Sequence, residues 1–254
     1  MKKIPVIIPV YRGEEELGKC ISALEEQSYK PIEIFIRDNN KDNVLFTAAV
    51  NEGLTRYSYS DACDYVLVLN QDAYVEREAL TGLVRCMELN PGCGIACPIQ
   101  LAYKNGPVNW GGSQDAFPFG KHLCRPVDSY QKDFETYWAN GAAMLLRTSM
   151  IREIGLLDKN MRFICSDSDY SFTARSRGWK IIVAVESRVY HSAGSSRAIE
   201  NDFLDRIKIR DVIYFADKWL TGGLYRGLSL EGPRLSDADI RLTVDNFKRT
   251  IGEC

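Results

Sequence analysis

The sequence predicts an α/β protein whose mostly parallel sheet is covered by helices on both faces. Over the first hundred residues, short apolar runs rich in β-branched residues alternate with stretches in which apolar residues recur every three or four positions. The first pattern is typical of strands buried on both faces, and the second of amphipathic helices. The order β-α-β-α-β-α-β indicates parallel strands joined by crossover helices.

The first elements show this alternation most clearly. Residues 4–10, IPVIIPV, form a β-branched apolar run that predicts a buried strand. Residues 14–27 follow as a helix, with one apolar stripe from Leu17 to Leu24. A second strand is expected at 32–36, IEIFI. The same alternation then predicts a helix over 45–57, a strand over 65–69, a helix over 77–90 and a strand over 94–101.

The second half of the chain is less regular. Residues 102–135 are rich in Gly, Pro, Asn and aromatic residues, which favours loops and short hairpins over a disordered linker. After this region the sequence predicts helices near 148–155 and 167–177, strands in WKIIVAV and RVYH, and an amphipathic helix over 202–220. We expect one domain over 1–254, with a first half (1–101), a smaller second half (102–200) and a C-terminal helical extension (201–254).

Composition excludes several classes of protein. The net charge of −2 gives no general attraction for nucleic acid or anionic lipid. No apolar run approaches the roughly 20 residues that span a bilayer, and the basic start of the chain lacks the long apolar core of a signal peptide. The eight cysteines contain no C-x-x-C pair, so reduced thiols are expected. These features predict a cytoplasmic protein, either free or at the inner membrane surface.

Polar residues follow three of the predicted strands. Tyr11 lies after the first, a cluster from Asp38 to Asp42 after the second, and Asp72 after the third. A parallel sheet binds ligands at the carboxyl ends of its strands, so these residues are expected at one edge. Neither the dinucleotide motif G-x-G-x-x-G nor the P-loop motif is present, and a divalent metal would then be the natural partner for a bound phosphate.

An ordered series of short motifs resembles family-two glycosyltransferases of the GT-A fold, with rhamnosyltransferase-like members closest. The motifs span about residues 4–197: IPVIIPVYRGEEELG, IEIFIRDNNKDN, DYVLVLNQDAYV, NGAAMLLR, GLLD, SDSDYSFTARSRGWKI and VYH. The resemblance implies transfer of a sugar from a UDP- or dTDP-linked donor to an acceptor hydroxyl, with inversion, in polysaccharide or glycoconjugate synthesis. It also implies Mn²⁺ or Mg²⁺ as cofactor, with residues 1–101 as the nucleotide-sugar-binding half and residues 102–200 as the acceptor-binding and catalytic half.

The resemblance assigns donor-side roles to residues at the strand ends. Asp38 matches the acid that accepts a hydrogen bond from N3–H of uracil or thymine, with a solvent-facing turn as the alternative. Asp72 matches the last acid of the D-x-D element, although Asn70 replaces the first. His191 matches a further metal ligand. A helix cap for Asp72 and a structural role for His191 remain alternatives. The donor-binding residues implied are Pro9, Tyr11, Asp38, Asn40, Asn51 and Asp72, and the metal ligands are Asp72 and His191.

The SDSDY motif implies the catalytic base. Asp167 takes the position of the base that deprotonates the acceptor hydroxyl, and Asp169 that of a second or structural acid. Ser166 replaces the Glu that is usual there, and a capping pair for the following helix is the alternative reading. The acceptor-binding residues implied are Trp110, Gly111, Trp138, Asn140, Gly141 and Asp169, with core packing as an alternative for the tryptophans.

Two rival functions share the fold class. A sugar-1-phosphate nucleotidyltransferase would carry a glycine-rich, basic loop after the first strand, where this chain has the acidic VYRGEEELG. A catalytically degenerate transferase that only binds a partner is the other rival, because of Asn70 and Ser166. The expected partners are a nucleotide-sugar donor and a glycan, lipid-linked or protein acceptor. The terminal helix is expected to pack on the domain, with a membrane surface or a second copy of the chain as alternatives.

Overall fold

The computed structural model describes residues 2–59, 61–114, 121–191, 202–228 and 236–252. Its centre is a nine-stranded sheet in the order β2-β1-β3-β10-β5-β11-β4, with β6 paired to β5 and β9 paired to β11. The main strands are β1 (Ile4–Val10), β2 (Ile32–Asp38), β3 (Tyr65–Leu69), β4 (Ala73–Val75), β5 (Cys93–Leu101), β10 (Ala143–Arg147) and β11 (Lys180–His191).

The predicted α/β class is confirmed, and the sheet is mixed. Strand β1 runs parallel to β2 and β3, and β11 runs parallel to β5. Strand β10 runs antiparallel between β3 and β5, so these two point the same way. The four strands predicted in the first hundred residues therefore share one direction, and their carboxyl ends lie along one edge of the sheet.

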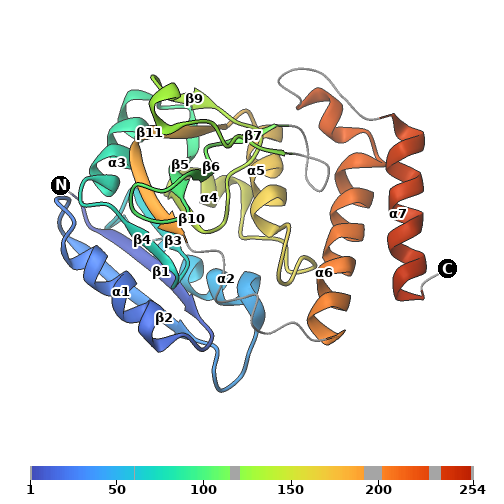
Figure 1. Ribbon diagram of the computed structural model, residues 1–254, viewed down its shortest axis with the longest axis horizontal. Coiled ribbons are helices and arrows are strands. Elements are labelled where there is room, and N and C mark those ends of the chain that lie inside the picture. The colour runs from blue at the N-terminus through green and yellow to red at the C-terminus, as the bar shows by residue number, and fades with distance from the viewer. Residues whose placement is uncertain (1, 60, 115–120, 192–201, 229–235, 253–254) are drawn as a thin grey trace.

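Helices cover both faces of the sheet (Figure 1). They are α1 (Glu14–Glu25), α2 (Leu45–Tyr57), α3 (Ala79–Leu89), α4 (Thr148–Ile154), α5 (Ser166–Ser176), α6 (Asp202–Phe215) and α7 (Asp237–Ile251). Buried side chains of α1 and α3 form one apolar cluster, and those of α2, α4 and α5 form another. Strand β3 supplies both clusters alternately, Val66 and Val68 to one and Leu67 and Leu69 to the other, as the two-residue period of a strand requires.

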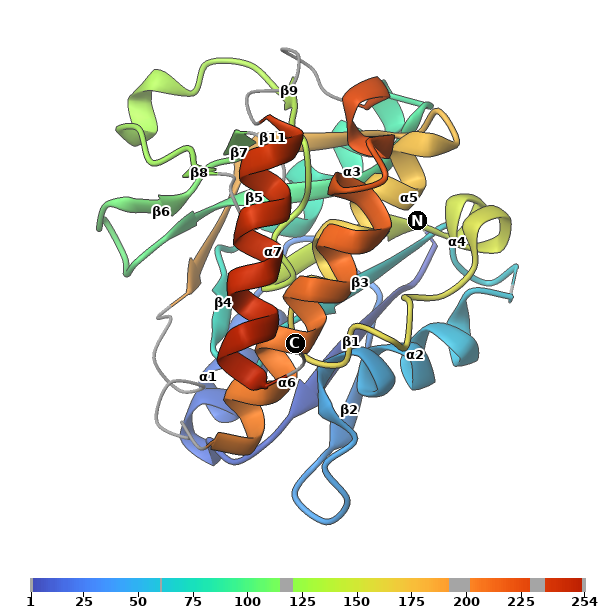
Figure 2. The ribbon, with the colours of Figure 1, turned by 90° about the vertical axis from the view of Figure 1, so that its right-hand side faces the viewer.

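The C-terminal part forms a further layer. Helix α6 continues into a π-helical turn, Ala216–Leu220, so only the first part of the predicted 202–220 helix is α-helical. Figure 2 shows α6 and α7 next to each other at the front of the molecule, and rings of the C-terminal layer pack on Phe172 of α5. Ser236 caps α7 by accepting a hydrogen bond from Asp239 N–H, a cap that the sequence analysis did not use. Among the described residues, no helix has the length and apolar composition needed to cross a membrane.

Two differences from the predicted elements matter for the site. Strand β4, which lies directly after Asp72, was not predicted. WKIIVAV and RVYH form a single strand, β11, whose register shifts between Ala184 and Arg188. The region 102–135 contains short pieces, as expected: β6 (Val108–Trp110), β7 (Ser113–Gln114), β8 (Lys121–His122), a 3₁₀ turn (Val127–Ser129) and β9 (Phe134–Glu135).

Candidate active site

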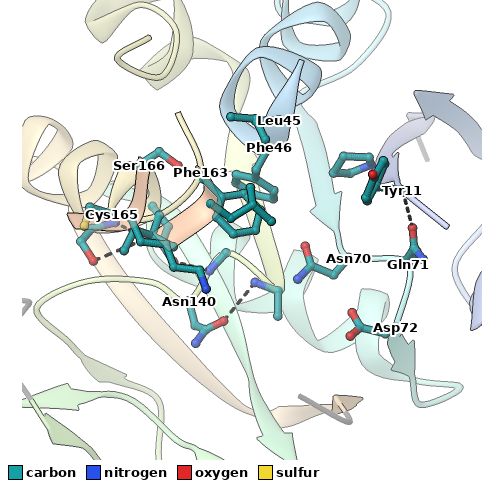
Figure 3. Close-up of a pocket in the computed structure, with 18 of the residues that line it drawn as sticks. Tyr11, Leu45, Phe46, Asn70, Gln71, Asp72, Asn140, Phe163, Cys165 and Ser166 are labelled. Atoms are coloured by element: carbon teal, nitrogen blue, oxygen red, sulfur yellow. Dashed lines mark hydrogen bonds between the residues drawn. The ribbon is translucent and has the colours of Figure 1, made fainter. Parts of the chain in front are cut away.

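A pocket of about 480 Å³ opens where β1 and β3 end and α5 begins. This volume lies within the range of small-molecule sites. Figure 3 shows Tyr11, Gln71 and Asp72 on one side of it, and Cys165 and Ser166 on the other. The predicted site residues that line it are Pro9, Tyr11, Asp72, Trp138, Asn140, Gly141 and Asp167. The predicted residues outside its lining are Asp38, Asn40, Asn51, Trp110, Gly111, Asp169 and His191.

Gln71 joins the ends of the first and third strands. Its side-chain Oε1 accepts a hydrogen bond from Tyr11 N–H over 2.8 Å, and its Nε2 donates to the carbonyl of Arg12 over 2.5 Å. Gln71 is nearly buried, so these bonds fix the backbone that carries Tyr11 and Asp72. This role could not be predicted from the sequence, because nothing in the middle residue of NQD indicates a partner sixty positions away.

Asp72 and His191 lie side by side. His191 Nε2 is 3.4 Å from Asp72 Oδ1, and their side chains are 15% and 5% exposed. The antiparallel pairing of β4 with β11, which sets His191 opposite Ala73, brings them together. Asp72 is not a helix cap, because β4 follows it and α3 begins only at Ala79, with Glu78 in the cap position.

The pair fits a divalent cation that is shared with a bound phosphate. A carboxylate and an imidazole are suitable ligands for Mn²⁺, and metals that bind nucleotides commonly take one or two protein ligands and several phosphate oxygens. Within the described ranges, no group of three or more His, Cys, Asp or Glu side chains could hold a metal by itself. Asp72 and His191 could supply two protein ligands to such an ion.

Asp167 lies in the first turn of α5, at the wall of the pocket. Its Oδ2 accepts a hydrogen bond from Gly141 N–H over 2.8 Å, and its Oδ1 accepts from Ser168 N–H over 2.8 Å. Burial raises the pKa of Asp167 above the usual range of an aspartate, and the N–H donors oppose that rise. A Cβ on Gly141 would lie 3.1 Å from Asp167 Oδ2, so glycine permits this close approach.

The backbone that leads into α5 is strained. Cys165, at the position before the helix, has φ of 66° and lines the pocket, and Leu45, which lines the pocket at the start of α2, has φ of 67°. Both are left-handed conformations that non-glycine residues seldom adopt, and such strain gathers at functional sites.

Asp169 has a different environment from Asp167. Its side chain is 2% exposed and pairs with Lys218 Nζ at 2.7 Å. Its Oδ1 also accepts a hydrogen bond from Trp219 Nε1 over 2.7 Å. Lys218 in turn contacts Asp158 at 3.0 Å. The structure thus places Asp169 in a buried contact that joins α5 to the C-terminal layer, and outside the pocket lining.

The residues after β2 contribute turns and ion pairs. Asp38 is exposed, and its Oδ1 accepts a hydrogen bond from Asn40 N–H over 2.8 Å, which is the turn considered as an alternative. Asn40 accepts from Arg12 N–H, also over 2.8 Å. Asn51 makes two hydrogen bonds with the backbone of Leu157 and so holds α2. Asn39 and Asn43, which were not predicted, line the pocket.

Aromatic rings form one end of the pocket. Trp138 lines it, and the ring of Trp110 lies behind, 6.4 Å away by centroid and only 1% exposed. His122 also lines the pocket, with its ring 5.6 Å from Trp138. Gly111 approaches Tyr130 so closely that a Cβ would lie 2.3 Å from its hydroxyl. Trp110 and Gly111 therefore pack behind the aromatic end of the pocket, and Trp138 is the tryptophan that lines the pocket.

An apolar wall closes the pocket opposite Asp72. Its members come from α2, from the segment before α5 and from α6, and they are Leu45, Phe46, Phe163, Ile164 and Leu204. Figure 3 shows Phe46 and Phe163 next to each other in this wall. The sequence analysis missed it, because isolated apolar residues cannot be told from core residues before the fold is known.

Asp211 on α6 anchors the segment that carries this wall. Its carboxylate is 1% exposed and accepts three backbone N–H bonds, from Arg162 over 3.1 Å, Phe163 over 2.7 Å and Ile164 over 2.9 Å. The neighbouring residues Cys165 to Asp167 line the pocket. Asp211 therefore holds the segment that precedes α5 in place, although Asp211 itself does not line the pocket.

Replacing Asp211 by Ala is expected to lower the free energy of unfolding by about 3 kcal/mol, because several buried N–H groups lose their acceptor. Asp217→Ala is the matched control: that side chain is 48% exposed, pairs with Lys248 at 3.5 Å, and should cost less than about 1 kcal/mol. Denaturant unfolding of both variants measures the difference. Equal stabilities would show that Asp211 does not anchor the segment.

Comparison with known proteins agrees with the architecture. Residues 6–46 match the model of the family described as Glycosyl transferase family 2. No curated protein matches the chain. Among solved structures, the chain is similar to one described as the crystal structure of GalNAc-T7 with UDP, GalNAc and Mn²⁺, with a TM-score of 0.64 and 13% identity. The alignment covers 98% of this chain and 55% of that one, so the protein spans about half the length of its structural neighbour. The chain therefore has the GT-A glycosyltransferase fold, and its first β-α-β unit matches the family-two model.

Proposed function

We propose that the protein is a glycosyltransferase that moves a sugar from a UDP- or dTDP-linked donor to an acceptor hydroxyl with inversion, in polysaccharide or glycoconjugate synthesis. The observation that supports this most is a single pocket at the carboxyl ends of β1 and β3 lined by two carboxylates in different settings, Asp72 beside His191 and Asp167 in the first turn of α5. Different environments suit the two carboxylates to different tasks.

Asp167 is the proposed general base. As the acceptor oxygen attacks the anomeric carbon, its proton passes to the Asp167 carboxylate, and the bond between that carbon and the diphosphate oxygen breaks. No covalent enzyme intermediate is needed. The N–H groups of Gly141 and Ser168 orient the carboxylate and favour its charged form, against the effect of burial. Such a base contributes about 10²–10⁴ in rate.

Asp72 and His191 are the proposed ligands of Mn²⁺ or Mg²⁺. When bound, the ion would neutralise the charge that develops on the departing diphosphate. Asn70 lines the pocket next to Asp72 and adds a neutral oxygen. On the donor side we also propose Pro9, Tyr11, Asp38 and Asn40, the last two through the exposed turn after β2. On the acceptor side we propose Trp138, Asn140 and Gly141, with Trp138 offering a flat face to a glycan or lipid-linked acceptor.

A thermal-shift screen of nucleotide sugars, with and without Mn²⁺, tests the proposal. A ligand at 100 times its Kd should stabilise the protein by about 2.7 kcal/mol. A nucleotidyltransferase would instead bind a nucleoside triphosphate together with a sugar 1-phosphate. A degenerate transferase would bind the donor without releasing nucleoside diphosphate.

The nucleotide preference follows from Asp38. UDP or dTDP should bind about tenfold more tightly than CDP, because a carboxylate accepts from the N3–H that cytosine lacks, and more tightly than GDP, because a purine places its N–H donors differently from uracil or thymine. Asp38→Asn should narrow this preference, since an amide can donate to cytosine N3 as well. Calorimetric titration with the four diphosphates measures both effects. Equal or tighter binding of GDP by the unchanged protein would rule out the assignment of Asp38.

A further inference from the structure

Lys208 brings a positive charge to the pocket from the C-terminal layer. Leu204 and Lys208, four residues apart on α6 and so on one face of the helix, both line the pocket. Among the lining residues that the structure describes, Lys208 is the only lysine or arginine, and the lining also contains the carboxylates of Asp72 and Asp167. A donor diphosphate that enters this pocket would meet these two negative charges, and its binding therefore requires a counter-charge.

The position of Lys208 is fixed by the contacts of its helix. Three residues later, Asp211 accepts the N–H groups of residues 162–164, the segment that leads to the proposed base. On the other side of Lys208, Leu204 and Ile207 pack against Leu45 at the start of α2. Lys208 is thus carried on a helix tied to two walls of the pocket, so little ordering is needed when a ligand binds.

The ion pair of Lys208 with Asp205 is easily replaced by a contact between Lys208 and a ligand. Lys208 Nζ lies 3.1 Å from Asp205 Oδ1, and the two side chains are 31% and 51% exposed. A partly exposed pair at this spacing contributes little to stability. A phosphate group offers more charge and more acceptor oxygens than this carboxylate, and lysine is a common phosphate ligand.

We propose that Lys208 binds the diphosphate of the nucleotide-sugar donor and neutralises the charge of the leaving group, in addition to any ion held by Asp72 and His191. This assignment rests on the proposed glycosyl transfer and adds a residue of α6 to the donor site. An anionic group on the acceptor is the other source of the same chemistry, and the experiment below separates the two.

The test is calorimetric titration with UDP, UMP and uridine, or the thymidine series, on the unchanged protein and on Lys208→Met. Lys208→Met should weaken diphosphate binding by about 10- to 100-fold, monophosphate binding by less and nucleoside binding not at all. Lys208→Arg should retain most of the affinity. Lys19→Met is the matched control, a helix lysine outside the pocket lining that is paired at 2.6 Å with Glu15. Salt should weaken diphosphate binding less steeply in Lys208→Met than in the unchanged protein.

Each outcome decides a separate point. If Lys208→Met binds the diphosphate as tightly as the unchanged protein, the assignment to the donor is wrong. If its turnover falls while its diphosphate affinity holds, Lys208 contacts the acceptor, which also overturns the assignment. If the unchanged protein binds neither UDP nor dTDP, the proposed function fails, and the role of Lys208 fails with it.

Discussion

Asp167→Asn is expected to lower kcat by about 10²–10⁴ while donor affinity stays close to that of the unchanged protein, because the change removes the proton acceptor and keeps the shape of the side chain. The asparagine has one acceptor oxygen, whereas the aspartate uses both of its oxygens to accept N–H groups, from Gly141 and Ser168. One N–H loses its partner, so a loss of about 1 kcal/mol of stability should accompany the loss of rate. Steady-state kinetics and denaturant unfolding on the same preparation separate the two effects.

Asp169→Asn is the matched control, a change of the same kind two residues away. It leaves Lys218 with one carboxylate in place of two, and it retains an acceptor for Trp219. We expect reduced stability with most of the turnover kept. If Asp169→Asn is inactive and Asp167→Asn turns over normally, the base has been assigned to the wrong residue.

The pH dependence of kcat/KM is a second test of Asp167 as the general base. A base must be deprotonated to act, so kcat/KM should fall as the pH drops through the pKa of Asp167. Burial raises that pKa, so the acid limb should lie at a higher pH than an ordinary aspartate would give. The limb should disappear from the residual activity of Asp167→Asn. An unchanged limb in that variant would assign the ionisation to another group.

Asp72→Ala is expected to abolish the metal-dependent part of nucleotide binding, a loss of about 100-fold or more, while the protein stays folded. Removal of the metal by a chelator should have the same effect on the unchanged protein and a much smaller one on the variant. The main alternative was that Asp72 is a helix cap. The structure excludes it, since Asp72 precedes β4 and does not cap α3. Calorimetry with UDP or dTDP, with and without Mn²⁺, measures the effect.

Asn70→Asp is the companion change. It restores a second carboxylate beside Asp72 in the pocket lining and should raise the affinity for the ion. If Mn²⁺ still strengthens nucleotide binding by Asp72→Ala as much as it does for the unchanged protein, the ion is held elsewhere.

Much of the first hundred residues could be predicted because local pattern and tertiary environment agree there. Strand β3 and helix α2 begin and end at the predicted residues, since an apolar run and an amphipathic repeat each have one suitable place against a covered sheet. Strand β4 was missed because three residues carry too little pattern, yet its pairing with β11 is what sets Asp72 beside His191.

The parts of the site that the sequence did not reveal depend on distant contacts. Gln71 and Asp211 act through backbone groups about 50 to 60 residues away, and polar residues of this kind are ordinarily expected at the surface. Asp167 and Asp169 are two residues apart, and only the packing of the C-terminal layer places one in the pocket and the other against Lys218. Tyr11 and Asp72 were expected at one edge of the sheet because they follow predicted strands, and both line the pocket; their roles stay predictions.

The most direct test of glycosyl transfer is the release of nucleoside diphosphate from a panel of UDP- and dTDP-sugars in the presence of Mn²⁺, with the unchanged protein and Asp167→Asn compared side by side. We expect the unchanged protein to release diphosphate from at least one donor, and Asp167→Asn to do so at least about 100-fold more slowly while binding that donor as tightly. Donors that bind in the pocket without any release, or release that is equal in the two proteins, would contradict this expectation.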